Sequence, residues 1–156
     1  MRIARYFLLF IFTVFNQAGW AQKTEADSLK KLLPGHREDT LKVDILIAIS
    51  RSEYRSSPDS AIVYGKEALN LAEKLSYGKG AANASKFIGM GYYFLGDYAE
   101  TITYWQQSLN WFEAINDKVG VSNILSNLGA LYANQGDDVQ AIDFHLSKLW
   151  AFDAIG

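Results

Sequence analysis

Apolar residues recur along the chain at steps of three and four, the spacing that places side chains on one stripe of an α-helix. Two such stripes stand forty residues apart, Ile102, Trp105, Leu109, Phe112 and Ile115 in one and Ile142, Leu146, Leu149, Phe152 and Ile155 in the other. Each stripe must be buried against a neighbour. The pattern therefore predicts packed helices near residues 24–33, 40–55, 58–76, 79–95, 97–115, 119–135 and 137–155.

The sequence is self-similar when it is shifted by forty residues. The shift superposes Gly80 on Gly120, Asn83 on Asn123, Gly89 on Gly129, Tyr92 on Tyr132 and Gly96-Asp97 on Gly136-Asp137. A weaker copy precedes these two, with Ile62, Tyr64 and Leu69 in place of Ile102, Tyr104 and Leu109. Self-similarity at such a period is typical of repeat architectures. We expect an all-α fold, an α-α superhelix of about three helix pairs, with units at 40–79, 80–119 and 120–156 after an N-terminal helix and linker at 22–39.

Short turns separate the two helices of each unit. Glycine tolerates the positive φ that ends one helix, and the following aspartate accepts hydrogen bonds from the free amides of the next. Gly96-Asp97 and Gly136-Asp137 have this pattern. In the first unit we expect Ser57 to be the cap and Pro58 to occupy the first helical turn, where its missing donor costs little.

The last two units resemble the tetratricopeptide repeat. Asn127-Leu128-Gly129, Tyr132, Gly136-Asp137, Ala141 and Leu149 match its signature, and Ile88-Gly89, Tyr92, Gly96-Asp97 and Leu109 repeat it, with Thr101 in place of the alanine. The period is 40 instead of the usual 34. Units of this length, with a joint such as Asn116-Asp117-Lys118, are similar to those of kinesin light chains and receptor-linked scaffolds. The resemblance implies a solenoid that binds a protein or peptide and is not an enzyme.

The N-terminal segment has the three-part pattern of a secretory signal. Arg2 and Arg5 form a basic start, residues 6–15 are almost wholly apolar, and the segment ends in small residues up to Ala21. We expect residues 1–21 to be removed on export and Gln22 to become the first residue, which predicts a periplasmic or extracellular protein. The apolar block is shorter than the roughly twenty residues of a membrane span. A membrane is an expected partner only if this segment is retained as an anchor.

A second resemblance concerns the order of the elements. An exported start, a Leu29-Lys30-Lys31-Leu32-Leu33 helix and degenerate repeats are similar to the sensory front ends of bacterial envelope signalling proteins. There, tetratricopeptide arrays precede a histidine kinase, nucleotide cyclase or DNA-binding output domain. The last apolar stripe has no polar closing helix after it, although repeat arrays normally need one. These points predict a truncated sensory module, or the sensor of an enzyme whose catalytic domain lies outside this chain.

Composition and motifs argue against other functions. The chain has no cysteine, a formal net charge of −2 and no basic run, so thiolate sites and nucleic-acid partners are not expected. Neither histidine belongs to a metal-binding motif. His145 aligns with Trp105 and is expected to be packed with a hydrogen-bond partner, whereas His36 is expected to be solvated. Asp137-Asp138 opens a helix, so we interpret this pair as capping residues. No catalytic residue, cofactor or metal is predicted.

The resemblance implies that the first helices of successive units line a groove for the partner. By residue-wise alignment this groove presents Asn83, Lys86, Met90, Tyr93, Asn123, Asn127, Ala130 and Asn134. Asparagine amides offer both donors and an acceptor to a peptide backbone, although solvated polar positions are an equally good interpretation. Lysine and arginine do not cluster among these residues, so capture of a C-terminal carboxylate is not expected. Tyr93 and Trp111 are the aromatic residues expected on the surface as partner anchors.

Overall fold

The chain is a row of antiparallel helices, described by a computed structural model for residues 25–153. A helix covering 25–32 is followed by α2 (Thr40–Glu53), α3 (Pro58–Lys74), α4 (Gly78–Leu95), α5 (Tyr98–Ala114), α6 (Lys118–Asn134) and α7 (Asp138–Asp153). Each labelled helix begins and ends within two residues of its predicted position. The predicted signal peptide, residues 1–21, and Ile155 lie outside the described residues.

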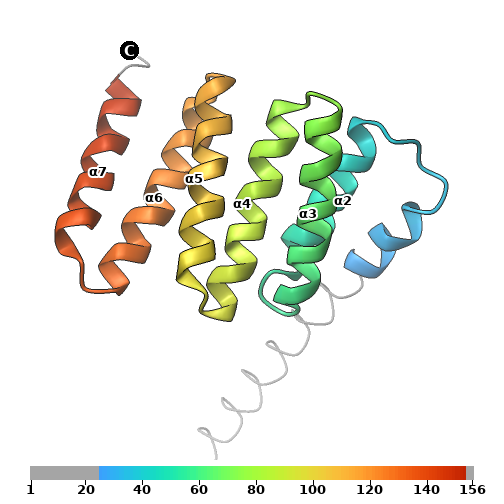
Figure 1. Cartoon of the computed structure of the whole chain (residues 1–156), viewed down its shortest axis with the longest axis horizontal. Coiled ribbons are helices and arrows are strands. Elements are labelled where there is room, and N and C mark those ends of the chain that lie inside the picture. The colour runs from blue at the N-terminus through green and yellow to red at the C-terminus, as the bar shows by residue number, and fades with distance from the viewer. Residues whose placement is uncertain (1–24, 154–156) are drawn as a thin grey trace, which may run out of the picture.

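The helices form three pairs that stack side by side into an α-α superhelix (Figure 1). The pairs are α2 with α3, α4 with α5, and α6 with α7, and each pair also packs against the next. The backbones of α2 and α4 come close together, whereas α4 and α6 are held farther apart. The predicted all-α solenoid is therefore confirmed.

The turns inside the second and third pairs follow the predicted chemistry. Gly96 and Gly136 have φ of 78° and 77°, in the left-handed region that glycine adopts without strain. Asp97 accepts a 3.2 Å hydrogen bond from the Glu100 amide, and Asp137 accepts one of 3.1 Å from the Gln140 amide. These bonds satisfy backbone donors that the helix itself leaves free. Asp137 is thus a capping residue.

The turn in the first pair differs from the prediction. Ser57 occupies the N-cap position of α3, but its side chain makes no capping hydrogen bond, so the expectation of a serine cap is wrong. Pro58 does stand in the first turn and has no amide hydrogen, which leaves fewer donors to cap. The hydroxyl of Ser60 instead donates to Glu53 Oε2 at 2.5 Å.

Two apolar cores run through the row of helices. The first lies among α2, α3 and α4 around Val43, Leu46 and Ile88, and the second lies among α4, α5 and α6 around Trp105, Phe112 and Leu128. Trp111 contacts both cores and is half-buried. The expectation that Trp111 is a surface anchor is therefore wrong, because its ring fills the space between neighbouring pairs.

The outer face of α7 is the apolar surface that no described element covers. Val139, Ile142, Leu146 and Leu149 are 71%, 57%, 48% and 59% exposed, and their spacing places them on one stripe. Of the residues forty positions earlier on α5, Leu109 is buried in the second core and Ile102 packs partly buried against it, while Gln106, the equivalent of Leu146, is a polar residue on the surface. None of the described helices is both long and apolar enough to cross a membrane.

Candidate functional site

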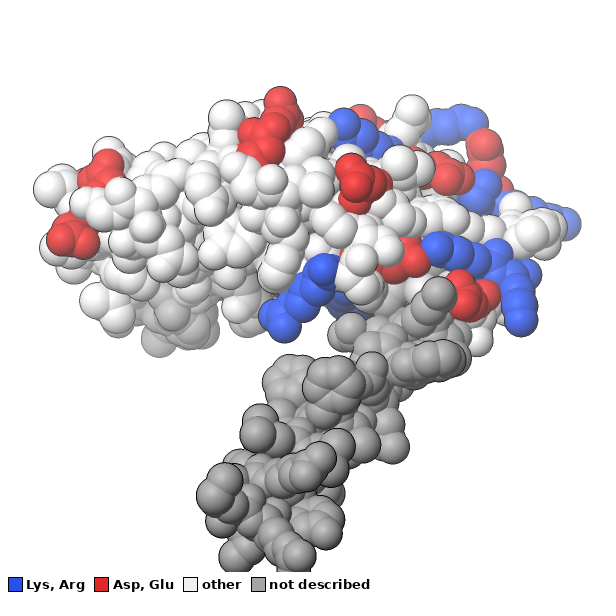
Figure 2. Space-filling view, turned by 90° about the horizontal axis from the view of Figure 1, so that it is seen from below, with Lys and Arg blue, Asp and Glu red and all other residues white. Residues whose placement is uncertain are grey.

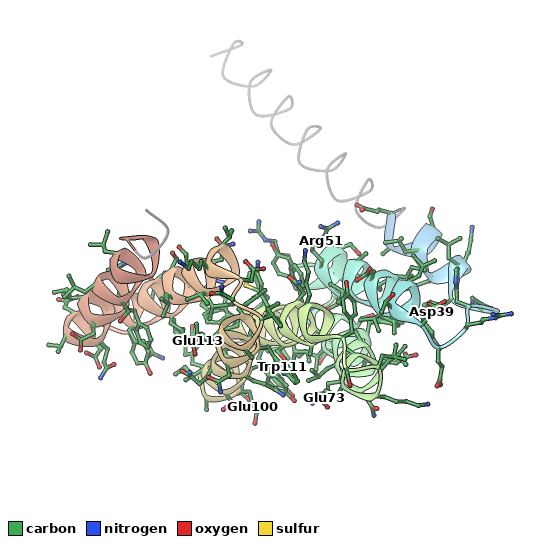
Figure 3. All side chains as sticks on the ribbon, turned by 90° about the horizontal axis from the view of Figure 1, so that it is seen from above. Asp39, Arg51, Glu73, Glu100, Trp111 and Glu113 are labelled. Atoms are coloured by element: carbon green, nitrogen blue, oxygen red, sulfur yellow. The ribbon has the colours of Figure 1, made fainter. Side chains whose placement is uncertain are left out.

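The first helices of the three pairs form one face of the molecule, which we call the first-helix face (α2, α4 and α6). Seen from above, Arg51 points toward the side on which α2 and α6 lie (Figure 3). Glu73 on α3 and Glu100 on α5 point to the opposite side. Two hollows open on the first-helix face, one between α2 and α4 and one between α4 and α6.

The α2–α4 hollow has a volume of about 500 Å³ and combines cations with aromatic side chains. Its lining residues are Asp44, Ile47, Ala48, Arg51, Tyr77, Lys79, Asn83, Lys86 and Phe87. The Tyr77 hydroxyl donates to Asp44 Oδ1 at 3.2 Å, and the Asn83 amide nitrogen donates to the Lys79 carbonyl at 2.9 Å. The side-chain oxygen of Asn83 and the three lining cations thus remain available to a ligand.

The cations of this hollow have no carboxylate partners among the described residues. Described ion pairs join Lys30 to Glu53, Lys42 to Glu67 and Lys74 to Glu38, all outside the hollow. Burial lowers the pKa of Lys86, and the nearby Arg51 guanidinium lowers it further. The partly buried Lys86 ammonium thus lies near a second positive charge, the exposed Arg51.

The α4–α6 hollow is smaller, about 170 Å³, and mostly apolar. It is lined by Met90, Tyr93, Trp105, Asn127, Ala130 and Leu131. The Trp105 ring stacks on Tyr93 with 5.9 Å between centroids, and its Nε1 donates to the Lys86 carbonyl at 3.2 Å. The Asn134 amide donates to the Tyr93 hydroxyl at 3.3 Å. These contacts hold the aromatic walls of the hollow in place.

The predicted groove residues are thus divided between two hollows. Asn83 and Lys86 line the first, while Met90, Tyr93, Asn127 and Ala130 line the second. Asn123 is exposed and lines neither, and Asn134 stands at the edge through its bond to Tyr93. Tyr93 packs against the second core and is partly exposed where it lines the α4–α6 hollow, so its role as a surface anchor stays a prediction. A role for these residues in binding stays a prediction.

Sequence reasoning missed two residues that shape the hollows. Arg51 was missed because the alignment that defined the groove used only the units at 80–119 and 120–156, whereas Arg51 comes from α2 of the first pair. Trp105 was assigned to the core because it lies on a second helix, yet its ring borders the α4–α6 hollow. The structure also brings Arg51 and Lys86 together, so the expectation that lysine and arginine do not cluster on this face is wrong.

His145 differs from its predicted environment. It occupies the position equivalent to Trp105, since a Cβ atom on Gly129 would lie 3.2 Å from its Cε1. The residue is nevertheless exposed, and no hydrogen bond of its side chain is found in the described region, so the packed histidine is not observed. The physical reason is that no described helix pair covers the outer side of α7. The described residues contain no group of three or more metal-ligating side chains.

Comparison with known families settles the nature of the repeats. The sequence model of the tetratricopeptide repeat family matches residues 80–147, which span α4 to α7. Residues 80–147 are tetratricopeptide repeats. No curated protein sequence matches the chain significantly.

Solved structures extend the likeness of fold to the first pair. The tetratricopeptide domain of Arabidopsis FLU superposes with a TM-score of 0.66 and 20% identity, over 74% of this chain and 98% of that one. BtubC from P. vanneervenii gives a TM-score of 0.65 and 19% identity, over 88% of this chain and 55% of that one. At these identities the likeness is one of fold. The tetratricopeptide repeats at residues 80–147 belong to a class of helical-repeat scaffolds that generally bind proteins or peptides.

Proposed function

We propose that the first-helix face of this tetratricopeptide array binds an extended segment of another protein. The observation that carries the proposal is the pair of hollows that lie next to each other along α4, one with free cations and one with an aromatic floor. Aromatic side chains and arginine are the residues that most often carry binding energy at interfaces. Asn127 borders the second hollow and offers amide groups to a peptide backbone.

The opposite face is less suited to a partner because its aromatic groups already satisfy each other. The Tyr92 and Tyr104 rings stack with 5.5 Å between centroids. Lys66 Nζ lies 2.9 Å from the Tyr92 hydroxyl and over both rings. A ligand there would have to displace contacts that are present in the free protein, which costs affinity.

We further propose that the array works outside the cytoplasm, as a binding region of an envelope or extracellular protein. The support is the charge order and apolar block of residues 2–21. Intact-mass analysis of the exported protein is expected to find Gln22 at the N-terminus. Recovery of the Met1 form in the membrane fraction would instead identify an anchor.

The peptide-binding proposal is tested by selection from a library of random nine-residue peptides displayed against residues 22–156. Selected peptides are expected to bind the parent and the control variant Gln106→Arg, which adds a cation at an exposed position on α5. Asn127→Arg places the same long side chain in the α4–α6 hollow and is expected to weaken the binding of the selected peptides at least tenfold. If no peptide is selected, or if both variants bind equally, the first-helix face is not the binding surface.

A further inference from the structure

Basic side chains gather on one half of the first-helix face. Arg51, Lys79 and Lys86 line the α2–α4 hollow, and none of them has an ion-pair partner in residues 25–153. Asp44 is the one carboxylate that lines this hollow, and it accepts the Tyr77 hydroxyl. Lys86 is partly buried with no counter-charge among the described residues, which disfavours folding, whereas Arg51 and Lys79 are exposed. A ligand that supplies negative charge therefore fits this hollow.

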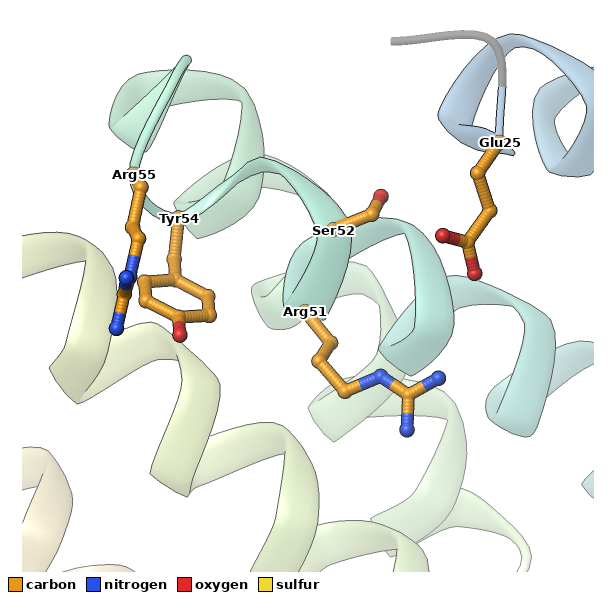
Figure 4. A pocket seen from close by; sticks show the side chains of 5 residues that line it. All are labelled: Glu25, Arg51, Ser52, Tyr54 and Arg55. Atoms are coloured by element: carbon orange, nitrogen blue, oxygen red, sulfur yellow. The ribbon is translucent and has the colours of Figure 1, made fainter. Parts of the chain in front are cut away.

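The basic surface continues beyond the hollow at the end of α2. A neighbouring hollow of about 340 Å³ is lined by Glu25, Arg51, Ser52, Tyr54 and Arg55 (Figure 4). The Arg55 guanidinium lies over the rings of Tyr54 and Phe94, at 5.4 and 5.7 Å from their centroids. Arg51 is shared by both hollows, so the cations from Lys79 to Arg55 form one continuous strip across α2 and α4. One isolated carboxylate could not contact all of these cations, so the strip suits a segment with more than one negative charge.

The other half of the array has the opposite charge. From residue 87 onward the sequence contains two lysines and eight aspartates or glutamates. Figure 2 shows the same division, with blue side chains gathered over the N-terminal half and only red ones breaking the white surface toward α7. An acidic segment is thus attracted to the cations of α2 and α4, whereas α6 has no carboxylate side chain and α7 has three, which favours placing the acidic part of the segment at α2 and α4.

Whereas the α2–α4 hollow suits an acidic side chain, the α4–α6 hollow suits an apolar one. Its volume of about 170 Å³ is below that of common small-molecule sites, roughly 300–1,000 Å³, but suits one apolar side chain. Met90, Trp105 and Leu131 supply apolar walls. Lys86 and Tyr93 stand seven positions apart on α4, about 10 Å along the helix axis. An extended peptide covers that distance with about three residues.

We propose that the partner segment is acidic at the α2–α4 hollow and carries a large apolar residue three to four positions away, which enters the α4–α6 hollow. This inference rests on the peptide-binding function proposed above and names the chemistry of the segment. Carboxylate side chains within the segment contact Arg51 and Lys86, while the apolar residue packs against Trp105 and Met90. Because the cations lie on α2 and α4, they determine which part of the segment lies at the α2–α4 hollow and which residue reaches the α4–α6 hollow.

The test uses two libraries of nine-residue peptides, one with acetylated and amidated ends and one with a free C-terminus. Peptides selected from the blocked library are expected to share Asp or Glu at one position and Leu, Phe or Trp three to four positions away. Their binding is expected to weaken as salt is raised, since exposed charges are screened. Selection only from the free-terminus library would identify the anion as a chain end and overturn the inference.

Matched variants then connect the acidic position to the cations. Lys86→Met keeps the aliphatic stem, and combining it with Arg51→Gln is expected to weaken the selected peptide at least tenfold and to remove the preference for Asp or Glu. Arg51→Lys should retain most of the affinity. The control Lys31→Gln removes an exposed cation of the N-terminal helix and should change nothing. Peptides that bind without an acidic preference, or equally to the double variant, would refute the inference but leave the peptide-binding function standing; failure to select any peptide would refute both.

Discussion

The indole ring of Trp105 packs so closely on Gly89 that a Cβ atom on this glycine would lie 2.4 Å from Trp105 Cδ1. Trp105 is 3% exposed, and its ring is held by the hydrogen bond from Nε1 to the Lys86 carbonyl and by the stack on Tyr93. The equivalent glycine of the next unit, Gly129, faces the exposed His145, where a Cβ atom would lie 3.2 Å from Cε1. A Cβ atom at this position therefore clashes with the ring in one repeat, while in the other it requires only a small shift of the His145 side chain.

This difference predicts opposite effects of one substitution at two aligned positions. Gly89→Ala is expected to destabilise the protein by about 1–3 kcal/mol, because overpacking a buried ring outweighs the gain in helix propensity. Gly129→Ala is expected to be neutral or stabilising by up to about 1 kcal/mol, since His145 can move aside. Urea unfolding followed by circular dichroism measures both. Equal destabilisation would mean that His145 is packed as tightly as Trp105.

The sequence predicted the helices and turns well because local chemistry determines them. The Gly96-Asp97 and Gly136-Asp137 turns combine a left-handed glycine with an aspartate cap, and both signals act within a few residues. The forty-residue shift also paired Gly89 with Gly129 correctly, since both face the same position of the following helix.

The environment of a side chain was harder to predict because it depends on elements distant in sequence. The repeat shift equates His145 with Trp105, but it does not show that α6 covers Trp105 while no described helix covers His145. Arg51 and Lys86 lie thirty-five positions apart, and only the packing of α2 on α4 brings their charges together. Trp111 was similarly misplaced, because neighbouring pairs bury part of its ring.

The exposed stripe of α7 predicts self-association through that helix. Ile142 and Leu146 are 57% and 48% exposed, and contiguous apolar patches of this kind promote contact between molecules. Replacing both by glutamate is expected to shift sedimentation profiles of residues 22–156 toward the monomer and to change stability by no more than about 1 kcal/mol in total. Adding a polar closing helix after Gly156 should have the same effect on association. A parent protein that is already monomeric at high concentration would contradict this prediction.

Lys86 is expected to lower the stability of the free protein. Burial and the Arg51 guanidinium lower its pKa below 10.5, so the folded state disfavours the ammonium form. This penalty is fully present below the lowered pKa and vanishes as the pH rises past 10.5. Lys86→Met should therefore raise the melting temperature at pH 7 while it weakens peptide binding. The exposed Lys31→Met is the control, expected to change neither; a lower melting temperature for Lys86→Met would show that the ammonium is stabilised in the free protein.

Glu53 ties the N-terminal helix to the first pair. It accepts from Lys30 Nζ at 2.6 Å and from Ser60 Oγ at 2.5 Å, and its side chain is 11% exposed. Glu53→Ala is expected to cost about 1–3 kcal/mol because two donors lose their acceptor. Lys30→Ala should cost about 1 kcal/mol or less, as a partly exposed ion pair contributes little. Thermal unfolding of both variants checks this order. Lys30 Nζ also lies 5.1 Å from the centroid of the Tyr64 ring, and the reverse order would mean that this contact matters more than the bonds to Glu53.

The contribution of the Lys30–Glu53 hydrogen bond to stability depends on pH in a defined direction. The hydrogen bond to Glu53 raises the pKa of Lys30 above 10.5. The stability that this hydrogen bond contributes is therefore present at neutral pH, and it is lost only as the pH rises through the raised pKa of Lys30. The stability difference between the parent and Lys30→Ala should stay constant from pH 7 to 10 and shrink above that range.

The central claim, that the partner segment lies across α2, α4 and α6, is tested most directly by NMR. Residues 22–156 labelled with ¹⁵N are titrated with a peptide selected from the blocked library, and backbone amide shifts are mapped onto the helices. The account predicts the largest shifts around Arg51, Asn83, Lys86, Met90 and Asn127, with α3 and the Tyr92–Tyr104 stack little changed. Shifts concentrated on α3 and α5, or on the exposed stripe of α7, would contradict it.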